Sequence, residues 1–157
     1  RAQAAHGLGA LCEKGLKLKP ETVSALESAL EDKHPDVVIQ AALSLKICSS
    51  KKSETQLLKI LKANQKREDG YDMAIRSAVI QALATCSDNK TGKAVKALIP
   101  ELEKHEDLSY DNTITAVLMK IGDPSALPAL QKHLEKLLAR KPKDRGETVG
   151  SSSQSCT

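Results

Sequence analysis

A leucine-centred helical pattern recurs along the chain at nearly constant spacing, and it restricts the fold more than any other feature. The central leucines are Leu8, Leu45, Leu83 and Leu118, at steps of 37, 38 and 35 residues. Each lies in an apolar stretch with helical periodicity, and more polar stretches with paired leucines lie between them. Such helix pairs bury their apolar faces only by stacking on neighbours. We therefore predict an all-α α-solenoid of stacked antiparallel helix pairs, with about four repeats.

The segment from Lys120 to Leu134 shows how one repeat leads into the next. Ile121 ends an apolar stripe, and Gly122 suits the left-handed conformation that ends a helix. Asp123 can cap the following helix, and Pro124 suits its first turn. The segment predicts the end of one helix, a tight turn and the start of another.

The chain divides into a repeat domain and a polar tail. Residues 1–140 form the predicted helical repeat domain, and residues 141–157 are expected to be a disordered tail because they offer no apolar face. Pro100 is expected to bend or locally open the helix that contains it. The expected helices are 1–14, 20–32, 37–48, 54–66, 72–86, 93–105, 112–121 and 125–140.

Four short motifs resemble the HEAT-repeat family, specifically its short subtype seen in phycobilisome-lyase-like repeats. Residues 121–130, IGDPSALPAL, match almost completely; residues 72–76 and 34–38 match the turn in part, and residues 1–9 match from the arginine onward. The loop Arg67–Tyr71 and Pro100 depart from the pattern. The resemblance implies that the second helix of each pair lines a concave face. Its outward positions, our candidate partner-binding residues, are then His6, Gln40, Leu43, Gln81, Thr85 and Lys120.

Composition and charge argue against several function classes. The chain has a net charge of +4, but residues 132–145 alone carry +4, so residues 1–131 are nearly neutral. With no Phe or Trp and two Tyr, the body lacks the basic, aromatic surface of a nucleic-acid-binding protein. No apolar run reaches the roughly 20 residues of a membrane span. The sequence therefore argues against nucleic acid as a partner, and no membrane association is expected.

The cysteines are expected to be reduced. Cys12, Cys48 and Cys86 fall near the ends of apolar helices, where a thiol acts as a small hydrophobic group. Cys156 lies beside the last residue, in no prenylation signal. No CxxC spacing predicts a zinc site, so we expect a reducing, cytoplasmic location.

No catalytic or metal-binding arrangement stands out. The single His105–Glu106 pair resembles one element of the di-iron site of deoxyhypusine hydroxylase, a HEAT-like enzyme, but a metal needs several converging ligands. We interpret that pair as a surface feature and predict no metal and no cofactor. Arg1 and Arg76, at the arginine position of the family motif, are expected to bond neighbouring turns rather than a ligand.

The leading functional hypothesis is a non-enzymatic scaffold that binds another protein on its concave face. It rests on the repeat and on the lack of a catalytic constellation. One alternative is an enzyme or enzyme subunit of the lyase-like HEAT type, acting on a chromophore-bearing protein. Another is nucleic-acid binding through HEAT-like repeats.

The two ends of the repeat domain are expected to differ. The chain starts at Arg1 in mid-pattern, so residues 1–14 are interpreted as the second helix of an incomplete pair. Ala4, Leu8 and Leu11 are expected on one side, with Ala5 and Cys12 facing a missing neighbour. Low amide protection and weak self-association are predicted there. The polar residues around the leucines of the last helix suit a cap.

Overall fold

The computed structural model describes residues 1–63, 70–88, 91–104 and 107–139. The expected tail 141–157 with Cys156, the His105–Glu106 pair and residues 67–69 of the Arg67–Tyr71 loop lie outside this part of the chain. The described elements are helices, with no strand among them, and the all-α prediction is confirmed. None of these helices is both long and apolar enough to cross a membrane.

The helices follow the predicted order with small shifts at their ends. Pro20 and Pro35 each occupy the first turn of a helix, where a missing N–H costs nothing. Two 3₁₀ turns, η1 (Lys51–Ser53) and η3 (Pro124–Ala126), precede the fourth and last α-helices. The α-helices are α1 (Ala2–Glu13), α2 (Pro20–Ala29), α3 (Pro35–Cys48), α4 (Glu54–Ala63), α5 (Gly70–Cys86), α6 (Lys93–Lys104), α7 (Leu108–Ile121) and α8 (Leu127–Ala139).

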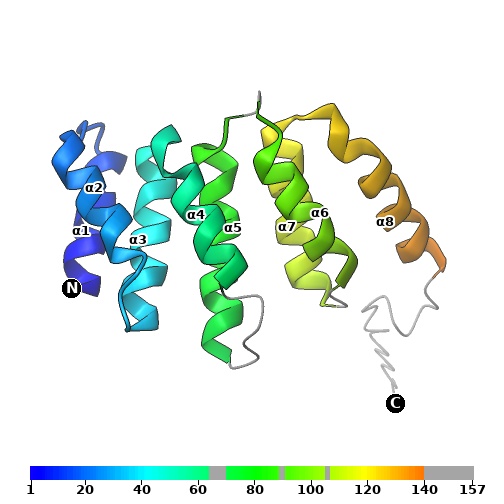
Figure 1. Ribbon diagram of the computed structural model, residues 1–157, viewed down its shortest axis with the longest axis horizontal. Helices are drawn as coiled ribbons and strands as arrows, with labels where there is room; N and C mark the ends of the chain where they lie inside the picture. Colours follow the sequence, from blue (N-terminus) through cyan, green and yellow to red (C-terminus); the bar gives the residue numbers. More distant parts are fainter. Residues whose placement is uncertain (64–69, 89–90, 105–106, 140–157) are drawn as a thin grey trace, which may run out of the picture.

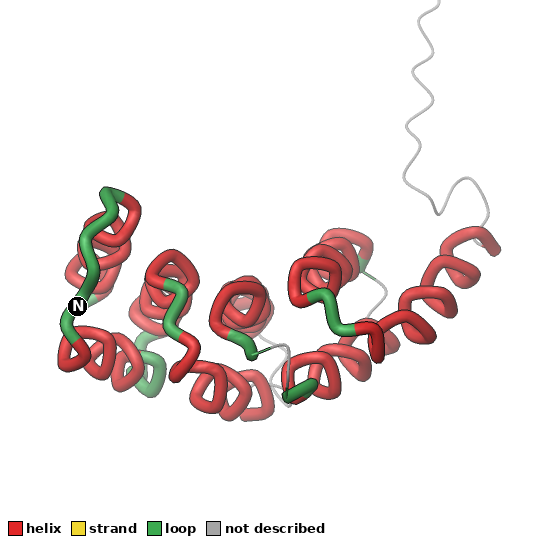
Figure 2. Tube along the Cα trace, turned by 90° about the horizontal axis from the view of Figure 1, so that it is seen from above, coloured by secondary structure: helices red, strands yellow, loops and turns green. Residues whose placement is uncertain are grey.

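The helices form two rows (Figure 1). One row, here the inner row, contains α1, α3, α5 and α7, each packed on the next. The outer row contains α2, α4, α6 and α8, and its first three members pack on α3, α5 and α7 respectively. Seen from above, the two rows follow an arc, and the inner row lies on its hollow side (Figure 2). The predicted α-solenoid of antiparallel pairs is confirmed.

Small side chains allow the inner helices to approach closely. On α1, Gly9 is buried against α3: a β-carbon added to it would lie 2.6 Å from Ser44 Oγ. Ser44 Oγ donates a hydrogen bond of 2.7 Å to the carbonyl oxygen of Ala5. Between α3 and α5, Thr85 Oγ1 donates to the carbonyl oxygen of Lys46 at 2.7 Å. Short hydroxyl side chains of one inner helix therefore donate directly to backbone carbonyl groups of the neighbouring inner helix.

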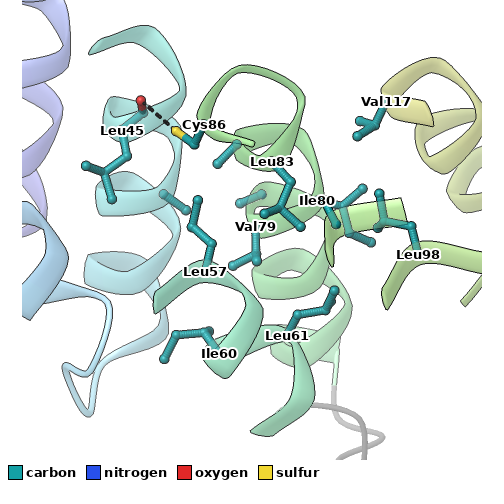
Figure 3. Packing of buried hydrophobic residues seen from close by; sticks show 14 of the residues in the cluster. Leu45, Leu57, Ile60, Leu61, Val79, Ile80, Leu83, Cys86, Leu98 and Val117 are labelled. Carbon is teal, nitrogen blue, oxygen red and sulfur yellow. Dashed lines mark hydrogen bonds between the residues drawn. The ribbon is translucent and has the colours of Figure 1, made fainter. Parts of the chain in front are cut away.

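The core is aliphatic and runs through both rows (Figure 3). The central leucines Leu45, Leu83 and Leu118 are fully buried, as the repeat predicts. Two leucines four residues apart also lie in α4, in α6 and in α8, and Leu26 of α2 is followed by Leu30 at its C-cap; Leu57 and Leu61 of α4 are completely buried. The core thus continues from one helix pair to the next, as expected when each pair buries the apolar face of its neighbour.

The turn between α7 and α8 agrees with the sequence prediction. Gly122 ends α7 with φ of 70°, in the left-handed region. The Asp123 carboxylate accepts a hydrogen bond of 2.9 Å from the Ser125 backbone N–H, which lowers the pKa of Asp123. Pro100, in contrast, does not interrupt α6, which runs continuously from Lys93 to Lys104. Pro100 itself is exposed, so its ring needs no space in the core.

The expectation of reduced cysteines is wrong for two of them. Cys12 of α1 and Cys48 of α3 form a disulfide, while Cys86 is free and buried. Both paired cysteines lie where the two inner helices touch, with their Cα atoms 5.3 Å apart. Neighbouring helices in the close-packed inner row thus bring together cysteines that are 36 residues apart in sequence.

The predicted orientation of the first helix is also wrong. Ala5 and Cys12 face α3, whereas Ala4 and Leu11 are exposed and Leu8 is half-buried. Ala5 and Gly9, four residues apart on one side of α1, are small enough to permit close approach to α3.

The last helix is not the polar cap expected. Leu127, Leu134 and Leu138 of α8 are exposed. The polar residues of α8 lie among these leucines without covering them.

Candidate functional site

A groove of about 790 Å³ lies between α1 and α3, and its lining residues all belong to these two helices of the inner row. We call it the concave groove. From α1 it is lined by His6 and Glu13, and from α3 by Gln40, Leu43 and Ile47, among others. Leu43 is half-buried and Ile47 is 37% exposed, so both offer apolar surface to a ligand. The lining is thus a mixture of apolar and polar groups, as in surfaces that bind protein segments.

Three of the six candidate residues lie together in this groove: His6, Gln40 and Leu43. Gln81 and Thr85 lie one helix further along, on α5, where their polar groups already bond within the chain. Lys120 lies exposed on α7. The structure therefore brings half of the candidate set into one groove and leaves the other half outside its lining.

Lys46 is one residue of this face that the sequence reasoning missed. It lines the concave groove, and its Nζ donates to Gln81 Oε1 at 3.0 Å while its carbonyl oxygen accepts from Thr85. Lys46 follows the central leucine Leu45 directly, and Gly9 follows Leu8 in the same way. The position directly after the central leucine therefore faces the next inner helix. Aligning the repeats by their central leucines could have identified Lys46 as a residue at this position.

The lining carries charges of both signs. Glu13 and Asp36 supply carboxylates, and Lys46 supplies an ammonium group. The carboxylates outnumber the ammonium group two to one, so the lining is not a basic surface. Glu13, Asp36 and Ile47 also were not among the candidates, because they lie at the ends of helical patterns whose limits the sequence defines least well.

A second polar site lies buried between α5, α6, α7 and α8. Arg76 of α5 forms an ion pair with Glu101 of α6, both shielded from solvent. The Tyr110 hydroxyl of α7 donates to Glu101 Oε2 at 3.1 Å, and the Arg76 guanidinium lies 5.8 Å from the Tyr110 ring centroid. Burial raises the pKa of Tyr110, so its hydroxyl stays protonated and remains a donor. This Arg76 cluster thus joins three consecutive helices.

The contact extends to the last helix. His133 of α8 is buried, and its Nε2 lies 3.9 Å from Asp111 Oδ2 of α7. This polar contact joins α8 to α7, beside the packing of α8 on α6.

Both arginines of the family motif bond within the chain, as predicted. Arg1 Nε lies 2.8 Å from Asp32 Oδ2 in the turn before α3. The backbone N–H of His34 is the main cause of the lowered pKa of Asp32, and Arg1 adds to it. Since Arg76 bonds Glu101, neither guanidinium is directed at the concave groove.

The one free thiol described is poorly suited to nucleophilic catalysis. Cys86 is fully buried, and its Sγ lies 3.3 Å from the Leu45 carbonyl oxygen, to which it donates (Figure 3). Burial raises the pKa of this thiol to about 11, so the reactive thiolate is scarce near neutral pH. Within residues 1–63, 70–88, 91–104 and 107–139, no three His, Cys, Asp or Glu side chains group closely enough to hold a metal ion.

The fold and these contacts define an all-α solenoid in which the motif residues hold neighbouring turns together. Residues 113–136 match the family model of the PBS lyase HEAT-like repeat, which is consistent with a HEAT-repeat family and confirms the resemblance. This segment includes the Gly122–Asp123 turn and most of α7 and α8. A comparison with curated proteins gives no match, and a comparison with solved structures gives none either.

Proposed function

We propose that this chain is a non-enzymatic scaffold that binds another protein on its concave face, with the concave groove as the contact. The observation that supports it most is the groove itself, where Leu43 and Ile47 lie among polar and charged groups of two helices. Side chains of this mixture bind a protein segment through apolar anchors and a polar rim. His6 and Gln40 supply hydrogen-bonding groups that give the bound segment its direction.

The proposal that the chain is not an enzyme has separate support. The charged side chains of the Arg76 cluster, Arg76 and Glu101, are buried and bonded to each other. A catalytic group needs access to a substrate, which these groups lack. The buried Cys86 lacks it as well.

The test is a quantitative pull-down with the full chain carrying Leu43→Asp, compared with wild type and with Ala25→Asp. Leu43 lines the groove, whereas Ala25 is exposed on the outer helix α2, so the two variants add the same charge on opposite faces. We expect a set of proteins that wild type and Ala25→Asp retain and Leu43→Asp loses. If every protein recovered with wild type binds both variants equally, the groove is not the binding surface.

The cytoplasmic location stays a prediction. A disulfide such as Cys12–Cys48 is typical of oxidising compartments, whereas a cytoplasmic protein would carry these cysteines as thiols. The redox state of Cys12 and Cys48 in cells distinguishes the two compartments. It is measured by acid quenching, alkylation of free thiols and mass spectrometry of the two cysteine peptides. Alkylated Cys12 and Cys48 would support the cytoplasm.

A further inference from the structure

Lysines lie wherever one outer helix runs beside the next (Figure 1), and we call each such line of contact a seam. At the seam between α2 and α4, Lys59 of α4 forms an ion pair with Glu31, which follows α2. At the seam between α6 and α8, Lys132 Nζ lies 2.8 Å from Glu103 Oε1. The bond from the lysine lowers the pKa of each carboxyl group, which keeps the carboxylate ionised. At both seams, a carboxylate of one helix therefore compensates a lysine of the next.

The middle seam, between α4 and α6, lacks this compensation. A groove of about 280 Å³ lies there, which we call the lysine groove. All three of its lysines are exposed, and no carboxylate of the described residues lines it. In the part of the chain that the structure describes, none of the three ammonium groups forms an ion pair. The lining is Leu58 and Lys62 of α4 with Lys93, Lys96 and Ala97 of α6.

The start of α6 adds to the positive charge of the lysine groove. Lys93 is the first residue of α6, and the first turn of this helix contains no acidic side chain. A helix N-terminus carries partial positive charge, so lysines are unfavourable there unless an anion is near. Asp123 does not fill this role: its carboxylate accepts chiefly from the Ser125 backbone N–H, and it is not part of the groove lining. The groove is therefore a site of uncompensated positive charge.

The lysine groove also has an aliphatic part. Leu58 and Ala97 are half-buried, so each adds apolar surface to the lining. No aromatic side chain of the described residues is available there for stacking on a nucleic-acid base. Carboxylates also lie at the two neighbouring seams, where they would disfavour a long polyanion that extends beyond the groove. These features favour a short acidic segment that carries an aliphatic side chain.

We propose that the lysine groove binds a short acidic segment of another protein. Aspartate or glutamate carboxylates of this segment pair with the three lysines, and an aliphatic side chain packs on Leu58 and Ala97. The bound carboxylates complete at the middle seam the charge compensation that Glu31 and Glu103 supply at the other two. The lysine groove belongs to the outer row and the concave groove to the inner row, so this is a second binding surface.

The chain's own longer stretches outside the described residues do not supply an acidic segment. Residues 64–69 carry two basic and two acidic side chains, and residues 140–157 carry four basic and two acidic ones. Neither stretch has the net negative charge that would complement the lysines. The groove also lies in the middle of the outer row, with α2 on one side and α8 on the other (Figure 1). The proposal therefore takes a separate protein as the source of the segment.

The test is a fluorescence anisotropy titration of a labelled peptide of Glu-Glu-Leu repeats with the full chain. A peptide of Gln-Gln-Leu repeats is the neutral control. The groove variant, Lys62→Glu with Lys93→Glu, reverses two charges of the lining. The matched variant, Lys17→Glu with Lys33→Glu, changes the net charge equally at exposed sites outside the groove. We expect the groove variant to bind the acidic peptide roughly tenfold more weakly than wild type and the matched variant to bind it like wild type.

Two controls keep the result specific. The groove variant should fold, because Lys93→Glu places a favourable acid in the first turn of α6; circular dichroism with thermal unfolding checks this, and Lys93→Gln with Lys96→Gln replaces it if it unfolds. Single-stranded DNA and vesicles containing phosphatidylserine are titrated in the same way. The proposal is overturned if wild type does not bind the acidic peptide, or if both variants bind it equally. It is equally overturned if DNA or the vesicles bind the groove more tightly than the peptide does.

Discussion

Replacing each of two glycines of α1 by alanine should change stability in opposite directions. Gly7 and Gly9 lie two residues apart in the same helix. A β-carbon at Gly7 meets no atom within 4 Å, whereas one at Gly9 would lie 2.6 Å from Ser44 Oγ and 3.1 Å from the Ser44 Cα atom. Only the second substitution therefore forces α1 away from α3.

The expected magnitudes follow from two separate effects. Alanine is favoured over glycine inside a helix by about 1 kcal/mol, and this gain applies to both positions. Overpacking a close contact costs about 1–3 kcal/mol, and this cost applies to Gly9 alone. Gly7→Ala should therefore stabilise the fold, and the difference in unfolding free energy between the two variants should be about 2 kcal/mol. The common helix-propensity term cancels from this difference, which isolates the packing of α1 on α3.

Urea unfolding followed by circular dichroism, at a concentration low enough to keep the chain monomeric, measures both free energies. In a double-mutant cycle, Gly9→Ala should cost less in a Ser44→Gly background than in wild type, because Ser44→Gly removes the Ser44 β-carbon and hydroxyl; Ser44→Gly by itself loses the hydrogen bond to Ala5, so only the coupling between the two changes is informative. If Gly9→Ala is as stable as Gly7→Ala, α1 does not pack on α3 through Gly9.

Three further predictions test other contacts. Reduction of the Cys12–Cys48 disulfide, which links residues 36 apart, should lower the free energy of unfolding by about 4 kcal/mol, and a Cys12→Ser, Cys48→Ser double variant should show no response to reductant in urea unfolding. Glu101→Ala removes the buried Glu101 carboxylate from its ion pair with Arg76 and should cost about 3–5 kcal/mol, whereas Glu101→Leu combined with Arg76→Met should cost much less in the same assay. The folded-state pKa of Cys86 is about 11, above the ordinary 9.0, so its stabilising effect is complete below pH 9 and is lost as pH rises toward 11. Relative to Cys86→Ala, wild type should lose about 3 kcal/mol of stability over that range, and parallel pH profiles would contradict the buried thiol.

The architecture could be predicted because helix formation and turn formation depend on nearby residues. The spacing of Leu45, Leu83 and Leu118 predicted buried helices, and Gly122 with Asp123 predicted the turn between α7 and α8. These features need only helical periodicity and local capping, both of which are visible in one stretch of sequence.

Contacts between separate helices were predicted less well, because they depend on how each helix is rotated about its axis. The sequence placed Ala5 and Cys12 on the wrong side of α1, and it therefore missed the pairing with Cys48. The rotation of α3 and α5 about their axes likewise brings Lys46 within hydrogen-bond distance of Gln81. Gln81 therefore bonds Lys46 and is not part of the lining of the concave groove. Packing of the smallest side chains sets these rotations, and apolar spacing alone does not distinguish the small residues that touch from those that remain exposed.

The covalent link between α1 and α3 also determines how the solenoid responds to mechanical tension. A chain pulled by its two ends unravels pair by pair, and each unfolded residue adds about 3.4 Å of length. The segment from Cys12 to Cys48, a sequence separation of 36 residues, cannot join that extension while the disulfide is intact. The oxidised chain should therefore reach a maximum length about 120 Å shorter than the reduced chain, and α2 stays inside a closed loop that force cannot straighten.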